Sequence, residues 1–191
     1  MCSSDLHALH LPNGQTQLVL AAPEKLHTPS RSFGWSIQLY AARTERSWGI
    51  GDYADLAELA KLAAHSGASF VLTCPLHAGN LGPQPQASPY SPTSREWLQV
   101  LYLSIDKITT SADLSDLRER GRALNAERII DRTQVWPIKL EALRRIWEAN
   151  GRTGGKDCDD WVAHRGADLR NFAAFMALSE IHGLPWQNWD E

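Results

Sequence analysis

The sequence predicts an α/β protein built around parallel strands. Two short apolar runs of strand type, residues 33–40 and 68–76, lie on either side of a segment, residues 52–66, whose apolar side chains recur at helical spacing. Asp52 is a suitable N-cap for this helix. Strand, helix and strand in this order predict a right-handed βαβ unit with two buried parallel strands, covered on both faces. The glycine-rich loop SWGIGD, residues 47–52, then lies at the carboxyl end of the first strand, where parallel α/β proteins bind ligands.

The segments on either side of this unit differ in character. Residues 7–31 contain a hairpin turn signal, Asn13-Gly14, followed by a short strand and a proline-punctuated connector, which we interpret as the tail of a preceding β-rich domain. After the second strand, a proline-rich loop of about twenty residues leads to a third apolar strand at 97–106, and loops of that length are normally functional. The remaining pattern is helical, over residues 112–120, 127–149 (two helices, or one helix interrupted at Pro137) and 157–182.

Both ends of the sequence carry unusual features. Residues 1–6, MCSSDL, match what the end of a common sequencing adapter encodes in one frame, and we interpret them as a sequencing or cloning artefact. The other end, LPWQNWDE, follows a helix and a Pro-Trp turn without a closing strand. We therefore expect the reading frame to be incomplete, with residues 32–191 forming one truncated domain.

Composition excludes several classes of function. The 191 residues are 43% hydrophobic and 21% charged, with a formal net charge of −3, as in ordinary soluble globular proteins. Arginines alternate with acidic residues rather than gathering into a basic face, which argues against nucleic-acid binding. No apolar run approaches a membrane span, and there is no signal-peptide layout. Three cysteines without a CxxC pair fit a reducing, cytoplasmic location and argue against a thiolate zinc site.

Three possible motifs have simpler explanations. GRTGGKD, residues 151–157, lacks the first glycine and the Ser or Thr of a phosphate loop, so it predicts a connection between helices. A metal site built from Cys158, Asp159, Asp160 and His164 matches no known ligand spacing, and an acidic helix N-terminus explains these residues without metal. A hydrolase triad drawn from Ser36, Ser91, His65 and His77 lacks a G-x-S-x-G elbow and a carboxylate partner.

Aromatic residues in two loops are the better candidates for ligand contact. Pro89 and Pro92 stiffen the backbone around Tyr90, whose ring suits packing against the C–H face of a sugar, although a core role is equally consistent with the pattern. Trp48, in SWGIGD, is a second candidate, and His77 either faces a ligand or packs in the interior. The other weighed tryptophans lie in strand or helix patterns and are predicted to be core residues: Trp35, Trp136, Trp147 and Trp161.

The order and spacing of the motifs from residue 33 onward resemble those of a known family. The segments are WSIQLYAARTERSWGIGDYADLAELA, GASFVLTCPLHA, SPYSPTSREWLQVLYLSID, VWPIKLEALRRIW and FAAFMALSEIHGLPWQNW. They resemble the start of the catalytic domain of the 4-alpha-glucanotransferases, also called amylomaltases or disproportionating enzymes, of glycoside hydrolase family 77. The resemblance implies a partial (β/α)8 TIM barrel with a helical insertion, preceded by the tail of a β-rich N-terminal domain.

The resemblance also implies a reaction and a set of binding residues. Family members move part of an α-1,4-glucan to the 4-hydroxyl of an acceptor by a retaining double displacement, with an Asp nucleophile, a Glu acid/base and a stabilising Asp, and with no cofactor or metal. These carboxylates are expected beyond Glu191, so no catalytic residue is predicted in this chain. The expected partners are maltooligosaccharides and α-1,4-glucans. The expected substrate-binding residues are Tyr90, Ser88, Trp48 and His77, with Gly49, Gly51, Asp52 and Pro89 as structural loop and cap residues.

One departure and two alternatives accompany the resemblance. Where family members commonly have Asn-Pro, this chain has Gln99-Val100, which puts the backbone turn there in question. The alternatives are a non-catalytic glucan-binding protein and a related barrel hydrolase. Because three barrel strands leave an open apolar edge, we expect the isolated chain to be poorly soluble and inactive.

Overall fold

The structure is a computed structural model that describes residues 5–22, 25, 28, 30–82, 84–183 and 186–189. The chain divides into two compact units, Met1–Phe33 and Gly34–Glu191, which are described separately. Of the segment interpreted as an artefact, residues 1–4 lie outside the described residues, whereas Asp5 and Leu6 belong to a strand.

The first unit contains a β-hairpin. Strands β1 (Asp5–His10) and β2 (Thr16–Ala21) pair antiparallel, and Gly14 adopts a positive φ of 81° in the turn between them. Asn13 stabilises the turn because its Oδ1 accepts a hydrogen bond of 3.0 Å from the backbone N–H of Gln15. The predicted Asn13-Gly14 turn is therefore confirmed.

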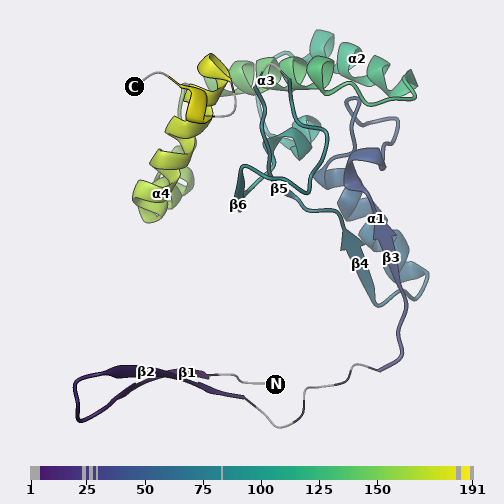
Figure 1. Cartoon of the computed structure of the whole chain (residues 1–191). Helices are drawn as coiled ribbons and strands as arrows, with labels where there is room; N and C mark the ends of the chain where they lie inside the picture. Colours follow the sequence, from purple (N-terminus) through teal and green to yellow (C-terminus); the bar gives the residue numbers. More distant parts are fainter. Residues whose placement is uncertain are drawn as a thin grey trace. The chain divides into compact units, whose positions relative to one another are not determined.

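The second unit begins with the predicted βαβ unit. Strands β3 (Gly34–Ile37) and β4 (Phe70–Thr73) pair parallel, with Trp35 opposite Val71, and helix α1 (Tyr53–His65) connects them (Figure 1). Asp52 is the N-cap of α1, as predicted. Its Oδ1 accepts from the backbone N–H groups of Ala54 and Asp55 at 2.8 and 3.1 Å.

The prediction that these strands are covered on both faces is wrong for the described residues. Phe70 and Leu72 point to the same face of β4 and are 53% and 60% exposed. Val71 and Thr73, which alternate with them, are half-buried. The face of the two-stranded sheet that carries Phe70 and Leu72 is therefore open among the described residues.

The predicted third parallel strand, residues 97–106, is also wrong. Strand β6 (Ser94–Leu98) ends at Leu98 and pairs antiparallel with β5 (His77–Ala78). The chain then forms two 3₁₀ turns, Val100–Tyr102 and Ile105–Lys107. Two carbonyl groups of this segment are bound by a lysine rather than by a strand: Lys139 Nζ donates to the carbonyl oxygens of Leu101 and Leu103 at 2.8 and 2.9 Å. Leu101, Tyr102 and Ile105 are therefore buried without joining a sheet, whereas Leu98 and Val100 stay exposed.

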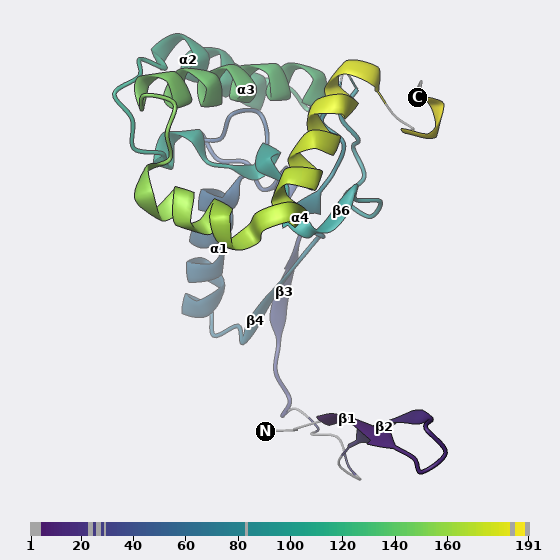
Figure 2. The ribbon, with the colours of Figure 1, turned by 90° about the vertical axis from the view of Figure 1, so that its left-hand side faces the viewer.

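Three longer helices complete the second unit: α2 (Ser115–Ala123), α3 (Arg132–Ala149) and α4 (Gly155–His182). Helices α2 and α3 lie side by side (Figure 1). Of the two alternatives for α3, the structure shows one helix that contains Pro137. Helix α4 bends at Gly166, whose φ of 57° and ψ of −126° are not helical (Figure 2). Among the helices that the structure describes, none combines the length and the apolar character that a membrane span requires.

The core of the second unit consists of two apolar clusters that α3 helps to form. One surrounds Leu39, Ile50 and Trp136, and the other surrounds Trp48, Leu117 and Ile146. Trp136 is a core residue, as predicted. Trp147 and Trp161 are 49% and 48% exposed, so the prediction that they are core residues is wrong.

Candidate functional site

The loop that carries the predicted sugar-binding residues is closed at its base by β5 and β6. The backbone N–H of Thr93 donates to the carbonyl of Ala78 at 2.8 Å, and that of Gln99 donates to Leu76 at 2.9 Å. Residues 79–93 therefore form a long excursion between two paired strands. Such loops on a fixed scaffold commonly carry binding residues.

Tyr90 is held in this loop with its side chain in solvent. Its backbone N–H donates to Ser88 Oγ at 3.4 Å, and Pro89 and Pro92 restrict the backbone on either side. The side chain is 64% exposed, unusual for a large aromatic residue. Of the two interpretations left open by the sequence, the structure favours an exposed ring over a core aromatic.

A small pocket lies at the foot of this loop. It is lined by His77, Gln86, Ser88, Pro89, Gln99, Tyr102 and Arg132, among others. The structure thus brings His77, Ser88 and Pro89 together, whereas Tyr90 stands outside the lining. Arg132, at the start of α3, places its guanidinium carbon 5.4 Å from the centre of the Tyr40 ring, which fixes a cationic donor at the pocket wall.

The departure at Gln99-Val100 leaves the backbone turn intact. Gln99 is buried, and its Oε1 accepts from the backbone N–H of Leu101 at 3.4 Å, in the position of an N-cap for the 3₁₀ turn. The hydroxyl of Tyr53 also donates to the carbonyl oxygen of Gln99 at 3.0 Å. A glutamine therefore supplies the polar contact at this position.

A half-buried tyrosine, Tyr53, and a buried one, Tyr102, lie beside this turn and remain uncharged at neutral pH. Tyr53 and Tyr102 contact each other edge to face, with ring centres 6.0 Å apart. Burial raises the pKa of Tyr53 to about 12, with a further contribution from Tyr102. Burial also raises the pKa of Tyr102 to about 12. Tyr102 therefore offers the pocket a neutral phenol.

The glycine-rich loop SWGIGD does not belong to this pocket. Trp48 is 2% exposed and lies in the apolar core, so the prediction that it contacts a ligand is wrong for this structure. Its indole N–H donates to Asp106 Oδ2 at 3.3 Å. Burial alone would raise the pKa of Asp106, but the bonds from Arg118, Trp48 and Arg122 outweigh burial and lower it. A buried, hydrogen-bonded indole has a structural role.

A network of side chains fixes the same loop to α1. Asp55 accepts hydrogen bonds from Thr44 Oγ1 at 2.8 Å, from Ser47 Oγ at 2.7 Å and from the backbone N–H of Asp52 at 3.0 Å. Together with the cap made by Asp52, these bonds complete a capping box. Gly49 adopts a φ of 75°, and a Cβ there would lie 2.7 Å from the Cβ of Leu124. The loop is therefore tightly packed, and its hydrogen bonds stabilise the N-terminus of α1.

Asn125, which is distant in sequence, binds the backbone of this glycine-rich loop and of the residues just before it. Its Nδ2 donates to the carbonyl oxygens of Thr44 and Ser47 at 3.1 and 2.6 Å, and its Oδ1 accepts from the backbone N–H of Gly49 at 3.0 Å. We expect Asn125→Ala to lower the free energy of unfolding by about 2 to 3 kcal/mol, since three backbone groups lose a partner. Urea unfolding followed by circular dichroism measures this. Asn150→Ala, at an exposed helix end, is the control, and similar losses in both variants would contradict the role of Asn125.

Sequence reasoning missed part of the pocket. Arg132 gave no local signal, because its neighbours in the pocket are distant in sequence. Gln86 lies in the same proline-rich loop as Ser88 and Pro89 but was not singled out as a binding residue. Gln99 was marked only by its departure from the family pattern. Among the described residues, no three His, Cys, Asp or Glu side chains come together as metal ligands, and the expectation of a site without metal stays a prediction.

Comparison with known proteins decides the family. A sequence model described as 4-alpha-glucanotransferase matches residues 37–191. The chain belongs to the 4-alpha-glucanotransferase family. The resemblance found in the sequence motifs is thereby confirmed, and the family's enzymes are glucan-transferring transferases by name.

Individual relatives agree with this family membership. The 4-alpha-glucanotransferase of Mycobacterium bovis is 36% identical over 211 residues, covering 96% of this chain and 28% of the relative. That of Haemophilus influenzae is 34% identical over 125 residues, covering 61% of this chain and 18% of the relative. The chain thus spans just over a quarter of the length of its mycobacterial relative.

A solved structure supports the fold. The crystal structure of amylomaltase from Corynebacterium glutamicum matches with a TM-score of 0.72 and 24% sequence identity, covering 100% of this chain and 36% of that protein. At this identity the likeness shows the fold alone. The mixed helix and strand architecture predicted from the sequence is confirmed at this level.

Proposed function

We propose that this chain is the part of a 4-alpha-glucanotransferase that binds α-1,4-glucans, with the loop of residues 79–93 as the binding element. The observation that carries the proposal is an exposed tyrosine ring, Tyr90, on a braced loop beside a polar pocket. An exposed aromatic face offers apolar contact to the C–H face of a pyranose, and neighbouring polar groups offer hydrogen bonds to its hydroxyls.

The pocket has a volume of only about 10 Å³, so a sugar ring would lie over it rather than inside it. Its lining carries the polar groups that such binding needs. Ser88 supplies a hydroxyl, Gln86 an amide and Arg132 a cationic donor, while His77 lines the same space. His77 lies in β5 and Arg132 is the first residue of α3, whereas Gln86 and Ser88 lie on the loop, whose backbone Pro89 and Pro92 restrict. Little order is therefore lost when a sugar binds. We assign Tyr90 to the apolar contact and Ser88 and His77 to hydrogen bonding, while Pro89 restricts the loop backbone.

The transfer reaction and the barrel are also part of the proposal. The parallel pair β3 and β4 has an exposed apolar face at Phe70 and Leu72, which a continuing (β/α)8 barrel would cover. In the complete enzyme, we propose, residues 32–191 form the first part of this barrel, and a segment of an α-1,4-glucan moves to the 4-hydroxyl of an acceptor. The nucleophile and acid/base belong to segments outside these residues.

Tyr90→Ala tests the binding proposal. The affinity for maltose and for maltoheptaose should fall about tenfold, the effect of losing one aromatic contact worth near 1.4 kcal/mol. Tyr90→Phe should retain most of the affinity because it keeps the ring. Isothermal titration calorimetry measures both.

The control is Trp147→Ala, which removes an aromatic side chain of similar exposure from α3. It should bind both sugars like the unaltered chain. Equal affinity of the Tyr90→Ala variant and the unaltered chain, or no binding of either sugar by the unaltered chain, would overturn the proposal.

A further inference from the structure

A second, larger groove lies between the loop of residues 79–93, strand β6 and the C-terminal half of α4. Its volume is about 900 Å³, within the range of roughly 300 to 1,000 Å³ typical of small-molecule sites. Four aromatic side chains line it, those of Trp97, Phe172, Phe175 and Trp186. The groove is therefore large enough for several sugar units.

The polar lining of the groove is uncharged. The described lining residues include four side-chain amides, from Asn80, Gln84, Gln86 and Gln187, together with hydroxyl groups, and none of them is ionisable. Among the described residues, the side-chain amides of Gln84 and Gln86 form no hydrogen bond within the protein, while the backbone N–H of Gln86 donates to the carbonyl oxygen of Asn80. Amides both donate and accept, which matches the hydroxyl groups of a neutral sugar, whereas an anionic or cationic ligand would find no counter-charge.

The aromatic residues of the groove have different roles. Trp97 stacks on Phe172, with ring centres 5.2 Å apart and an angle of 14°, and the Arg165 guanidinium lies 4.7 Å from the Trp97 ring centre. The Trp97 ring is thus already packed within the protein and forms a wall. Trp186, in the 3₁₀ turn Trp186–Asn188, is 57% exposed and provides a free aromatic surface.

The groove lies beside the pocket at the foot of the loop. Gln86 and Pro92 line both the groove and that pocket, whereas Tyr90 lines neither. Ser91, the residue after Tyr90, lines the groove. A linear ligand that packs on Tyr90 and extends past Ser91 would therefore enter the groove.

We propose that this groove, called here the Trp186 groove, binds the extension of an α-1,4-glucan whose end lies at Tyr90. This inference rests on the proposed function and adds a length requirement to it. Trp186 contacts the C–H face of a distal sugar. Gln84 and Gln86 form hydrogen bonds with hydroxyl groups of the sugar units that lie between Tyr90 and Trp186. The chain should therefore bind maltoheptaose more tightly than maltose.

Trp186→Ala is the main test, with maltoheptaose and maltose as probes in titration calorimetry. We expect its dissociation constant for maltoheptaose to rise about fivefold to tenfold and that for maltose to change less than about twofold. Gln84→Ala, which removes an exposed polar side chain, is a second variant that should also weaken maltoheptaose alone. Trp147→Ala is the matched control, and circular dichroism checks that each variant is folded.

The outcomes separate this inference from the proposed function. If Tyr90→Ala weakens both sugars while Trp186→Ala and Gln84→Ala leave maltoheptaose binding unchanged, the Trp186 groove is not a glucan site and the proposed function stands. If Trp147→Ala weakens maltoheptaose as much as Trp186→Ala does, the effect is not specific to the groove and the inference is overturned. If neither sugar binds the unaltered chain, both proposals fail.

Discussion

Gly51→Ala should largely unfold the second unit, with a loss of about 4 kcal/mol or more of unfolding free energy. A Cβ at this position would lie 2.0 Å from the carbonyl oxygen of Leu39 and 2.8 Å from that of Ala42. Both neighbours are backbone atoms. The N–H of Gly51 donates to the carbonyl oxygen of Tyr40 at 3.0 Å, so the loop is held against the 3₁₀ turn Leu39–Ala41. Urea unfolding followed by circular dichroism measures the loss.

Gly67→Ala, at the opposite end of α1, is the matched control. Gly67 has a positive φ of 81°, but nothing lies within 4 Å of the position of a Cβ. The cost of that substitution is conformational alone, about 1 kcal/mol. Equal losses at the two glycines would show that close backbone approach at Gly51 is not the cause.

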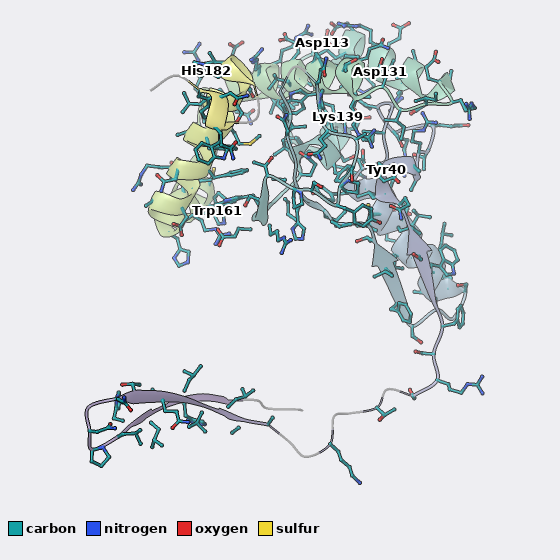
Figure 3. The ribbon with its side chains drawn as sticks, viewed as in Figure 1. Tyr40, Asp113, Asp131, Lys139, Trp161 and His182 are labelled. Carbon is teal, nitrogen blue, oxygen red and sulfur yellow. The ribbon has the colours of Figure 1, made fainter. Side chains whose placement is uncertain are left out.

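The stability of the chain should rise with pH between pH 8 and pH 10 because of Lys139. This side chain lies beneath α3 (Figure 3), is 1% exposed, and binds the two carbonyl groups of the 3₁₀ segment. Burial lowers the pKa of Lys139 to about 8 from 10.5, opposed in part by Asp52, Asp55 and Asp106. In this window the unfolded chain binds more protons than the folded chain. Unfolding free energy therefore rises, by about 2 kcal/mol from pH 7 to pH 10.

Urea unfolding at successive pH values tests this effect by comparing the unaltered chain with Lys139→Met. The variant should lose the rise, because it has no titrating group at this site. Lys61→Met, at an exposed position, should retain it. The measurement stops at pH 10 because the raised pKa values of Tyr53 and Tyr102 lower stability at higher pH. A Lys139→Met variant with the full rise would contradict the assignment.

The sequence predicted those structural features that depend on interactions between residues close together in the chain. The hairpin turn at Asn13-Gly14, the cap at Asp52 and the βαβ unit depend on residues close together in the chain, and the structure confirms all three. The run at 97–106 has the composition of a buried strand, but burial and strand pairing are separate properties. Its carbonyl groups are bound by a lysine 36 and 38 residues away, which no local pattern reveals.

The residues of the candidate site show the same difference between features set by neighbouring residues and features set by distant ones. The proline-flanked motif around Tyr90 left an exposed ring and a core ring equally open, and the structure shows the exposed one. Trp48 was misjudged because a tryptophan in a glycine-rich loop has the same local pattern whether it meets a ligand or fills the core. Its burial depends on Gly121, where a Cβ would lie 2.9 Å from Trp48 atoms, and on Asp106. Arg132 enters the pocket only through the position of α3.

The bonds of Lys139 also bear on how the chain folds. The carbonyl groups of Leu101 and Leu103 gain their protein partner only when α3 has formed and docked, and burying them without it would be costly. Neither element is therefore expected to be stable without the other. Hydrogen exchange of the amides of Leu101 to Leu103 should slow together with that of the central α3 amides, as one cooperative unit. The loop of residues 79–93 would then acquire its fixed base at β6 late, when this unit closes. The proposed sugar binding would thus depend on the docking of α3 as a whole, and not only on Arg132 at its start.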